Sequence, residues 1–308
     1  MAFRGRLGFA GPVVSRRLTT SRTCRLANAS YDRLRELTAA NLEAFDRIVD
    51  VLAELRITLY RFSSNTIPFA SHPIAAQFDW ATEFAETLAA LGRRLRALDI
   101  RVSMHPGQFT VLNSPRPDVV TAAIAELSYH AQLLDALGAP ASSKMVLHLG
   151  GAFTDKAAAI ESFVRGCDRL PDAVRRRLVI ENDDRIFHAD EVLGVSRRTG
   201  LPVAFDWLHH RANPCGRPAR EALADCLATW RPVDGVPKVH LSSQQPDAPS
   251  GAHADYVELP DFLQLLEAAG GATFDCMLEA KQKELAVLRL RGELASMGKR
   301  GGRIRTGR

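Results

Sequence analysis

The sequence lacks the features that define several large classes of protein. Its cysteines are odd in number and include no CxxC pair; they are Cys24, Cys167, Cys215, Cys226 and Cys276. This pattern argues against a disulfide framework and a zinc–thiolate site, and it favours a reducing compartment. No run of about 18 apolar residues occurs, so we predict no membrane span. No G-x-G-x-x-G follows the first predicted strand, which argues against a doubly wound dinucleotide-binding sheet.

Charge is unevenly distributed along the chain. The first 31 residues contain no Asp or Glu, a composition also found in transit peptides. Residues 6–10 look like a first strand and no cleavable apolar segment precedes them, so we expect the fold to begin there. Residues 281–308 carry nine Lys or Arg against two Glu, whereas residues 1–280 carry 31 basic and 33 acidic side chains. The body of the protein is therefore not basic, and its basic tail either binds polyanions or is simply solvated.

Strand-like and helix-like periods alternate from end to end. We predict strands at residues 6–10, 57–62, 100–105, 144–149, 178–181, 202–206, 238–241 and 274–279. We predict helices at residues 30–55, 79–98, 117–137, 154–170, 189–198, 218–229, 260–270 and 282–295. Eight strand-then-helix units of this total length favour a single α/β domain, a (β/α)₈ TIM barrel over residues 1–295. The small, glycine-rich and basic residues 296–308 predict a disordered tail.

Residues able to bind metals stand where these strands end. They are His105, His148, Glu181, Asp206, His209, His240 and Glu279, with His253 in the loop after the seventh strand. Each alone could be an ordinary buried side chain, but in a barrel all of them meet at one mouth. Buried carboxylates need cations, and histidine donors supply little compensation. We therefore expect two or three divalent ions, with a carboxylate such as Glu181 as a bridge, because imidazole and carboxylate suit Zn²⁺, Mn²⁺ or Fe²⁺.

Such a cluster favours phosphodiester hydrolysis. Metals about 4 Å apart can activate water at neutral pH and stabilise the attacking and leaving oxygens. A metal-dependent sugar isomerase or epimerase can use two metals on the same fold, so the fold alone does not decide. A general abasic-site endonuclease is a second alternative. A non-catalytic DNA-binding module is a third, although a closed structural site would use fewer ligands.

Nine short motifs resemble the UV damage endonuclease family of metal-dependent DNA-repair enzymes, and the resemblance runs from Arg6 to about Glu284. The motifs are Arg6–Gly8, Ile67–Pro73, Ser103–Gln108, Leu147–Gly151, Glu181–Asp183, Leu208–His210, Pro237–Gln244, Gly251–His253 and Glu279–Lys281. The resemblance implies incision of damaged duplex DNA immediately 5′ to a UV photoproduct or another distorting lesion, which leaves a 3′-hydroxyl and starts excision repair. It also implies up to three ions, with Mn²⁺ ahead of Zn²⁺, Mg²⁺ or Co²⁺.

The resemblance further implies roles for single residues. The eight residues at the strand ends would be the metal ligands, and Glu181, Lys238 and Glu279 would be catalytic. Lys238 matches a lysine that can be carboxylated in the family. The residues expected to contact the lesion or the DNA are Phe9, Gln108, Phe109, His72 and Arg61. The family often has Tyr where Phe9 and Phe109 stand, so we expect the chemistry to be kept more closely than the lesion preference. We also expect a monomer without membrane contact, located in the cytoplasm with the nucleoid.

Overall fold

The strands form the predicted barrel. The computed structural model describes residues 3–153 and 155–302. The parallel strands are β1 (Leu7–Ala10), β2 (Leu59–Arg61), β3 (Arg101–Ser103), β4 (Met145–His148), β5 (Leu178–Glu181), β6 (Val203–Asp206), β7 (Lys238–Leu241) and β8 (Asp275–Leu278). Their hydrogen-bonded order is β3-β2-β1-β8-β7-β6-β5-β4. A parallel bridge between Met104 and Met145 joins the two end strands and closes the barrel.

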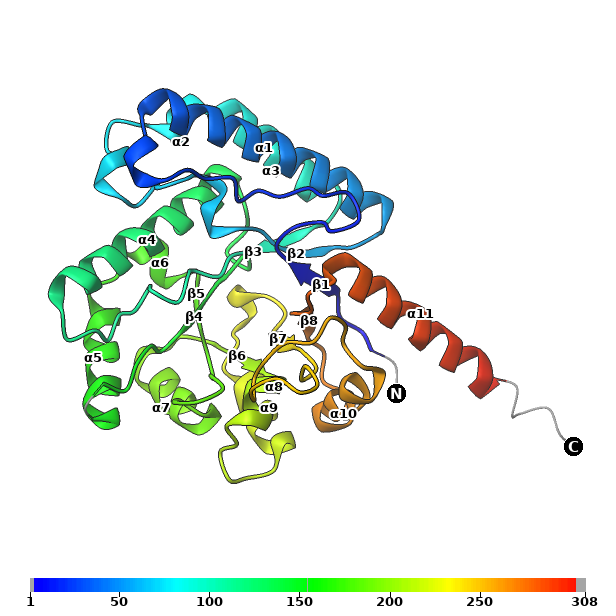
Figure 1. Ribbon diagram of the computed structural model, residues 1–308. Coiled ribbons are helices and arrows are strands. Elements are labelled where there is room, and N and C mark those ends of the chain that lie inside the picture. The colour runs from blue at the N-terminus through cyan, green and yellow to red at the C-terminus, as the bar shows by residue number, and fades with distance from the viewer. Residues whose placement is uncertain (1–2, 154, 303–308) are drawn as a thin grey trace, which may run out of the picture.

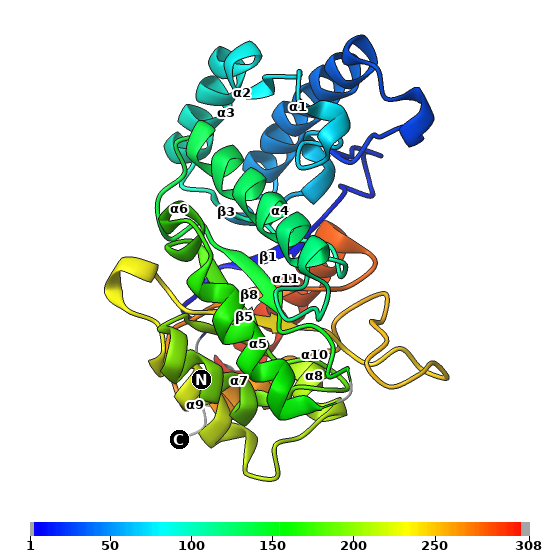
Figure 2. The same ribbon diagram turned by 90° about the vertical axis from the view of Figure 1, so that its left-hand side faces the viewer.

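Helices surround the strands. They are α1 (Tyr31–Glu54), α2 (Trp80–Glu83), α3 (Ala85–Ala97), α4 (Pro117–Ala136), α5 (Lys156–Asp168), α6 (Asp172–Arg175), α7 (Ala189–Thr199), α8 (Trp207–Ala212), α9 (Ala219–Ala228), α10 (Leu259–Ala269) and α11 (Lys283–Gly302). In Figure 1, α1 and α3 lie together above the strands and α11 lies on the right. Figure 2 shows α4 and α5 in front of the strands, so they cover that side of the barrel.

Helix α1 illustrates how the sequence produces this outer layer. The Ser30 side chain accepts a hydrogen bond from the Arg33 amide and caps the first turn. Leu34, Phe45 and Ile48 recur at helical spacing and are buried, so one face of the helix packs on the barrel. The same amphipathic pattern predicts most of the other helices.

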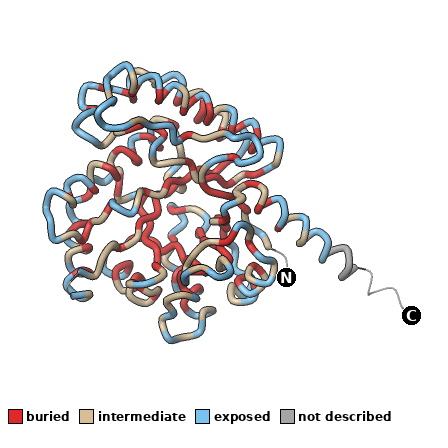
Figure 3. The backbone as a smooth tube through the Cα atoms, viewed as in Figure 1, coloured by how far each residue is buried: buried red, intermediate tan, exposed pale blue. Residues whose placement is uncertain are grey.

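The core lies between the strands and the inner faces of the helices. Figure 3 shows the buried residues concentrated in the middle of the molecule. Close packing reaches the backbone at Gly8, where a Cβ atom would lie 2.1 Å from the Leu59 carbonyl oxygen of the neighbouring strand. Only glycine lets β1 and β2 approach to this distance, so the close packing of the two strands explains why residue 8 is glycine, and no catalytic role is needed.

Several of the helix predictions need correction. The helix expected over 79–98 is divided at Phe84, whose φ of −106° and ψ of 19° are not helical. Helix α8 was not predicted, because six residues directly after a strand carry too little periodicity. The last helix runs to Gly302 and not to residue 295, so residues 296–302 continue the helix. The rest of the predicted tail, 303–308, lies outside the described residues.

Among the residues described, no helix is both long and apolar enough to cross a bilayer.

Candidate metal centre

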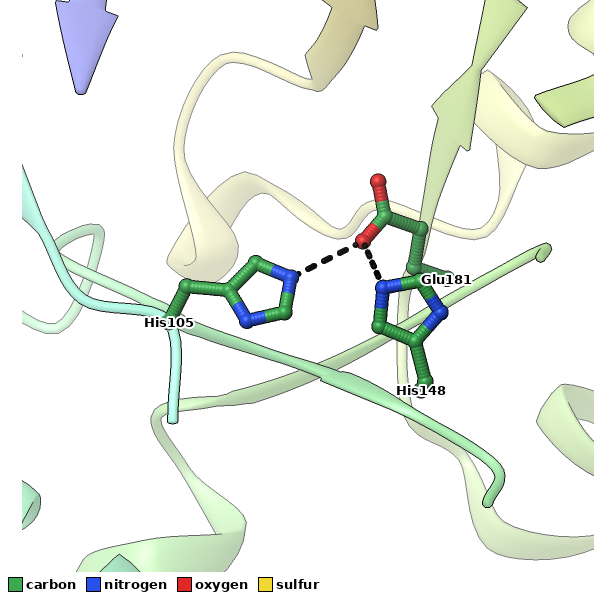
Figure 4. A group of neighbouring side chains, drawn as sticks. All are labelled: His105, His148 and Glu181. Carbon is green, nitrogen blue, oxygen red and sulfur yellow. Dashed lines mark hydrogen bonds and ion pairs between the residues drawn. The ribbon is translucent and has the colours of Figure 1, made fainter. Parts of the chain in front are cut away.

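The carboxylate of Glu181 lies at the centre of the barrel mouth. Glu181 ends β5, and its side chain is only 1% exposed. One carboxylate oxygen, Oε2, lies 3.2 Å from Nε2 of both His105 and His148, which follow or end the neighbouring strands β3 and β4 (Figure 4). The other oxygen, Oε1, lies 2.5 Å from Nδ1 of His240 on β7. Three strand ends therefore direct an imidazole at one buried carboxylate.

Glu181 is shared by three groups of possible metal ligands. The first adds His105 and His148, the second adds Asp206 and His209, and the third adds His240 and Glu279. Within each group the ligand atoms lie within 4.8 Å of one another. The structure thus brings seven of the eight predicted ligands into three overlapping sets, as expected for up to three ions bridged by one carboxylate.

The eighth predicted ligand, His253, lies at the edge of this cluster. Its Nε2 is 3.9 Å from Oε2 of Glu279, the residue directly after β8. Glu279 also has Oε1 at 2.5 Å from Arg61 Nη1 and 3.2 Å from His240 Nδ1. His253 is therefore close to the third group without belonging to it.

Asp206 shows most directly that the site has room for a cation. Its Oδ1 accepts a hydrogen bond of 2.7 Å from the His209 amide and caps α8. The side-chain amide of Asn182 donates to the Asp206 carbonyl and accepts from the Asp206 amide, at 3.0 and 2.9 Å, and so fixes the backbone. Asp206 Oδ2 is buried with no hydrogen-bond partner among the described residues, and so is His240 Nε2. Buried atoms of this kind normally have a partner, and a divalent ion would supply it.

The carboxylates and imidazoles of the mouth shift one another's pKa values. Burial opposes ionisation of Glu181, but the facing His240 and His148 outweigh it and hold the Glu181 pKa well below the usual range. Burial raises the pKa of Asp206 to about 6. Burial alone would lower the pKa of His209, but the Asp206 charge raises it to about 9. Protons thus compete for the same donor atoms that metals use.

A cavity of about 830 Å³ opens over these ligands. Five of the predicted ligands line it, together with Gln108 from the β3–α4 loop; these ligands are His105, His148, His209, His253 and Glu279. Phe109, next in sequence, is 73% exposed. Gly107 makes room for that ring, because a Cβ atom at residue 107 would lie 2.4 Å from the Phe109 ring. The predicted tip is therefore present: Gln108 lines the cavity and the Phe109 ring lies in solvent.

Comparison with known proteins agrees with this geometry. The family model described as UV-endonuclease UvdE matches residues 4–302. The chain belongs to the UvdE family. A UV DNA damage endonuclease of Bacillus cereus (strain Q1) is 38% identical over 268 residues, which cover 86% of this chain and 84% of that protein. The crystal structure of SacUVDE superposes with a TM-score of 0.88 at 34% identity and covers 96% of this chain and 100% of that one.

The family resemblance predicted from the nine motifs is thereby confirmed, and the chain is a DNA endonuclease, a hydrolase, of the UvdE family. A D-psicose 3-epimerase from Clostridium cellulolyticum H10 also superposes, with a TM-score of 0.53 at 14% identity over 77% of this chain and 79% of that one. At this identity the likeness shows the fold alone. The sugar-epimerase alternative therefore has only the barrel in its favour.

Two residues predicted from the UvdE resemblance lie inside the protein. Phe9 is fully buried and packs against Tyr60 with ring centroids 5.2 Å apart, so it cannot touch DNA and that prediction is wrong. Lys238 is fully buried, and its Nζ has no hydrogen-bond partner among the described residues. Burial lowers the Lys238 pKa well below its usual range, and the nearby Arg101 and Arg61 lower it further.

The two remaining DNA-contact predictions differ in position. Arg61 lines the cavity, although its guanidinium already pairs with Glu279. His72 is exposed, and its Nδ1 accepts a hydrogen bond of 3.1 Å from the Ile74 amide. His72 is not among the cavity-lining residues, so its contact with DNA stays a prediction.

Some residues of the site were not singled out from the sequence. Asn182 positions Asp206, while Arg185 and Lys283 line the cavity. Asn182 follows Glu181 directly after a predicted strand, and that placement was the available signal. Arg185 and Lys283 carried a weaker signal, because each stands four residues after a predicted ligand, Glu181 or Glu279.

Proposed function

We propose that this chain hydrolyses the phosphodiester bond immediately 5′ to a UV photoproduct, or another distorting lesion, in duplex DNA. The reaction leaves a 3′-hydroxyl and starts excision repair. The observation that carries this proposal is the Glu181 carboxylate, shared by three ligand groups under an open cavity, in a chain of the UvdE family. A closed structural metal site would not need three such groups or a cavity above them.

Two or three divalent ions, with Mn²⁺ as the first candidate, would occupy this centre. The residues that would hold them are His105, His148, Glu181, Asp206, His209, His240, His253 and Glu279. When bound, such ions lower the pKa of water and stabilise negative charge on phosphate oxygens. The partnerless Asp206 Oδ2 and His240 Nε2, and the exclusively nitrogen and oxygen donors, support this assignment.

The chain's own residues would organise the reaction around these ligands. We assign catalytic roles to Glu181, Lys238 and Glu279. Glu181 holds three imidazoles toward one point, and Glu279 holds the Arg61 guanidinium over the cavity. Burial lowers the pKa of Lys238 well below its usual range and so favours the neutral amine, which is the form that can be carboxylated.

The exposed loop tip would recognise the lesion. The Phe109 ring can stack on, or wedge between, bases that a lesion has already loosened, and Gln108 can read polar groups from the cavity side. Arg61 and His72 are the proposed phosphate contacts. Phe109 lacks the hydroxyl of the family's frequent Tyr, so its contribution comes from stacking. We further propose that a single chain acts on damaged duplex in the cytoplasm.

A plasmid-nicking assay tests the proposal. Purified protein with Mn²⁺ is given supercoiled plasmid that is either UV-irradiated or untreated. We expect nicking of the irradiated plasmid only, abolished by Glu181→Gln and retained by Glu258→Gln, a surface control that pairs with Arg289. Equal nicking of both plasmids would instead indicate a general nuclease. No nicking of either, with metal shown to be bound, would favour sugar chemistry.

A further inference from the structure

One of three lysine or arginine side chains that face the cavity has no partner. Arg61 Nη1 lies 2.5 Å from Glu279 Oε1, and Arg185 Nε lies 3.2 Å from Asp184 Oδ2. Both guanidinium groups are thus already paired with carboxylates. Lys283 lines the same cavity, and its ammonium group makes no hydrogen bond or ion pair within the described ranges 3–153 and 155–302. Of these three cations it is the one whose charged group has no carboxylate partner among the described residues.

The backbone of Lys283 is held in a rare conformation. Lys283 is the first residue of α11 and has a φ of +50°, in the left-handed region that residues with a side chain seldom adopt. Such conformations persist where the surrounding structure enforces them, and they are enriched at binding and active sites. Gly11 faces the lysine across the cavity wall, and a Cβ atom there would lie 4.0 Å from Lys283 Cε.

The next residue explains what holds this conformation. Glu284 is fully buried, and its carboxylate accepts hydrogen bonds from the amides of Val14 and Ser15 at 3.0 and 2.7 Å. Those amides belong to a short hairpin closed by pairing of Val13 with Leu18. Glu284 therefore ties the start of α11 to the hairpin, while Lys283 lines the cavity. The contacts of Glu284 therefore fix the backbone from which the Lys283 side chain extends.

Lys283 lines the cavity together with Arg61 and the predicted ligand Glu279. Burial and the charge of Arg61 lower its pKa, whereas the charges of Glu279 and Glu284 raise it. These are the groups at the β2 and β8 side of the mouth. A phosphate entering the cavity on that side would find a cation whose charge no carboxylate in hydrogen-bond contact has neutralised.

We propose that Lys283 binds a backbone phosphate of the DNA next to the phosphate that is hydrolysed. The proposal rests on the proposed DNA incision and adds one contact to it. A lysine suits this position because its ammonium is a compact charge on a flexible stem, which can follow a phosphate without the fixed geometry of a guanidinium. A contact to a phosphate that does not react stabilises substrate and transition state equally, so it affects KM and not kcat.

The test compares Lys283→Met with Lys281→Met in the full-length, Mn²⁺-loaded protein. Lys281 is exposed, lies outside the cavity lining and contacts Gln245 at 3.3 Å, so it matches the charge change two residues away. One probe is a duplex with a defined thymine dimer. The other is the same duplex already nicked 5′ to the dimer, which keeps the flanking phosphates but offers no bond to hydrolyse.

For Lys283→Met we expect KM for the intact duplex to rise about tenfold with kcat within about twofold. The slope of log binding constant against log salt for the nicked duplex should fall by about 1. Lys283→Arg should retain most of the affinity. Lys283→Gly, which suits the positive φ, should lose as much as Lys283→Met, and metal content should stay constant in all variants.

Equal salt slopes for Lys283→Met and Lys281→Met would overturn the proposal, as would loss of metal together with loss of affinity. If the wild-type protein binds the nicked duplex but never cuts the intact one, the proposed function fails. The salt slopes then still decide whether Lys283 binds phosphate.

Discussion

The two ends of the barrel both bury charge, but they balance it in different ways. At the N-terminal end, Arg101 Nη1 lies 2.8 Å from Asp275 Oδ2, with both side chains at most 6% exposed. Lys144 Nζ lies 2.7 Å from Asp234 Oδ1, with both side chains 1% exposed. Each of these buried charges has an opposite charge from the protein itself.

The C-terminal mouth holds its charges differently. Glu181, Asp206 and Glu279 converge there, and Arg61 is the arginine that pairs with one of them. Asp206 Oδ2 and His240 Nε2 are left without partners within the described part of the chain. The contrast indicates that the N-terminal end serves stability, whereas the mouth is completed by ions and substrate from outside.

The largest expected effect is at the mouth. Glu181→Gln removes the carboxylate that all three ligand groups share, so we expect loss of most bound metal. Incision should fall by about 10³-fold or more, because metal stabilisation of the reacting oxygens is worth several kcal/mol. His253→Ala should have a smaller effect, about tenfold, since His253 lies outside the three groups. Elemental analysis and single-turnover incision measure both, and equal metal loss in the two variants would contradict the central role of Glu181.

At the N-terminal end we expect loss of stability with metal binding intact. Arg101→Met leaves Asp275 buried without its cation and should lower the free energy of unfolding by about 3–5 kcal/mol. Arg116→Met, in an exposed pair with Asp118, is the matched control and should leave the melting temperature unchanged. Denaturant titration measures stability, and metal content per folded molecule should stay at the wild-type value. Metal loss in folded Arg101→Met would contradict the claim that the N-terminal end serves stability and the mouth serves metal binding.

Acid provides a third test, because a buried histidine on α4 that belongs to none of the ligand groups also titrates. His130 on α4 is fully buried, and burial lowers its pKa to about 4. Between pH 6.5 and 4 the unfolded chain binds a proton at residue 130 that the folded protein does not, so stability falls as pH falls. The total loss from this residue is up to about 3 kcal/mol.

His130→Gln keeps a polar group near the Glu126 carbonyl but does not titrate in this range. The difference in unfolding free energy between wild type and variant should therefore change steadily from pH 6.5 to 4 and stay constant above pH 7.5. A difference that does not depend on pH would show that His130 is not buried in its neutral form. Once the contribution of His130 to the pH dependence of the unfolding free energy is known, the contribution of the histidines at the mouth can be obtained from the remainder.

At the loop tip we expect an effect on incision alone. Phe109→Ala removes an exposed ring, and loss of one stacking contact should reduce incision of damaged duplex about tenfold. Metal content and thermal stability should not change, because the ring packs on no core residue. Incision of a dimer-containing duplex and metal analysis on the same preparation provide the measurement. Wild-type incision rates in this variant would contradict the proposed role of the Phe109 ring at the lesion.

The barrel and most of the centre could be predicted because both depend on local patterns. Apolar periods located all eight strands, and placing His105, His148 and Glu181 at strand ends was enough to bring them together. Phe9 could not be placed in this way. Its burial depends on packing against Tyr60, about fifty residues later in the sequence, and nothing local to residues 7–10 distinguishes a ring in the core from a ring at the surface.

The same limit explains the cavity wall. Lys283 and Glu284 are adjacent, yet one lines the cavity and the other accepts hydrogen bonds from a hairpin near the start of the chain. Which residue takes which role is decided by the left-handed turn at Lys283. No glycine or proline marks that turn in the sequence, so it could not be predicted.

The barrel is closed between β3 and β4 by the single bridge at Met104, and we call this contact the seam of the barrel. Between β3 and β4 the closure consists of two backbone hydrogen bonds, from Met104 N to Lys144 O and from Val146 N to Met104 O, each 3.1 Å long. His105 and His148 stand on opposite sides of this seam and meet at Glu181. An ion held by these three residues would link β3 to β4, the pair of neighbouring strands that is joined by a single bridge. Amide exchange at Met104 and Val146 should therefore slow when metal binds, so that the cofactor also governs how often the barrel opens.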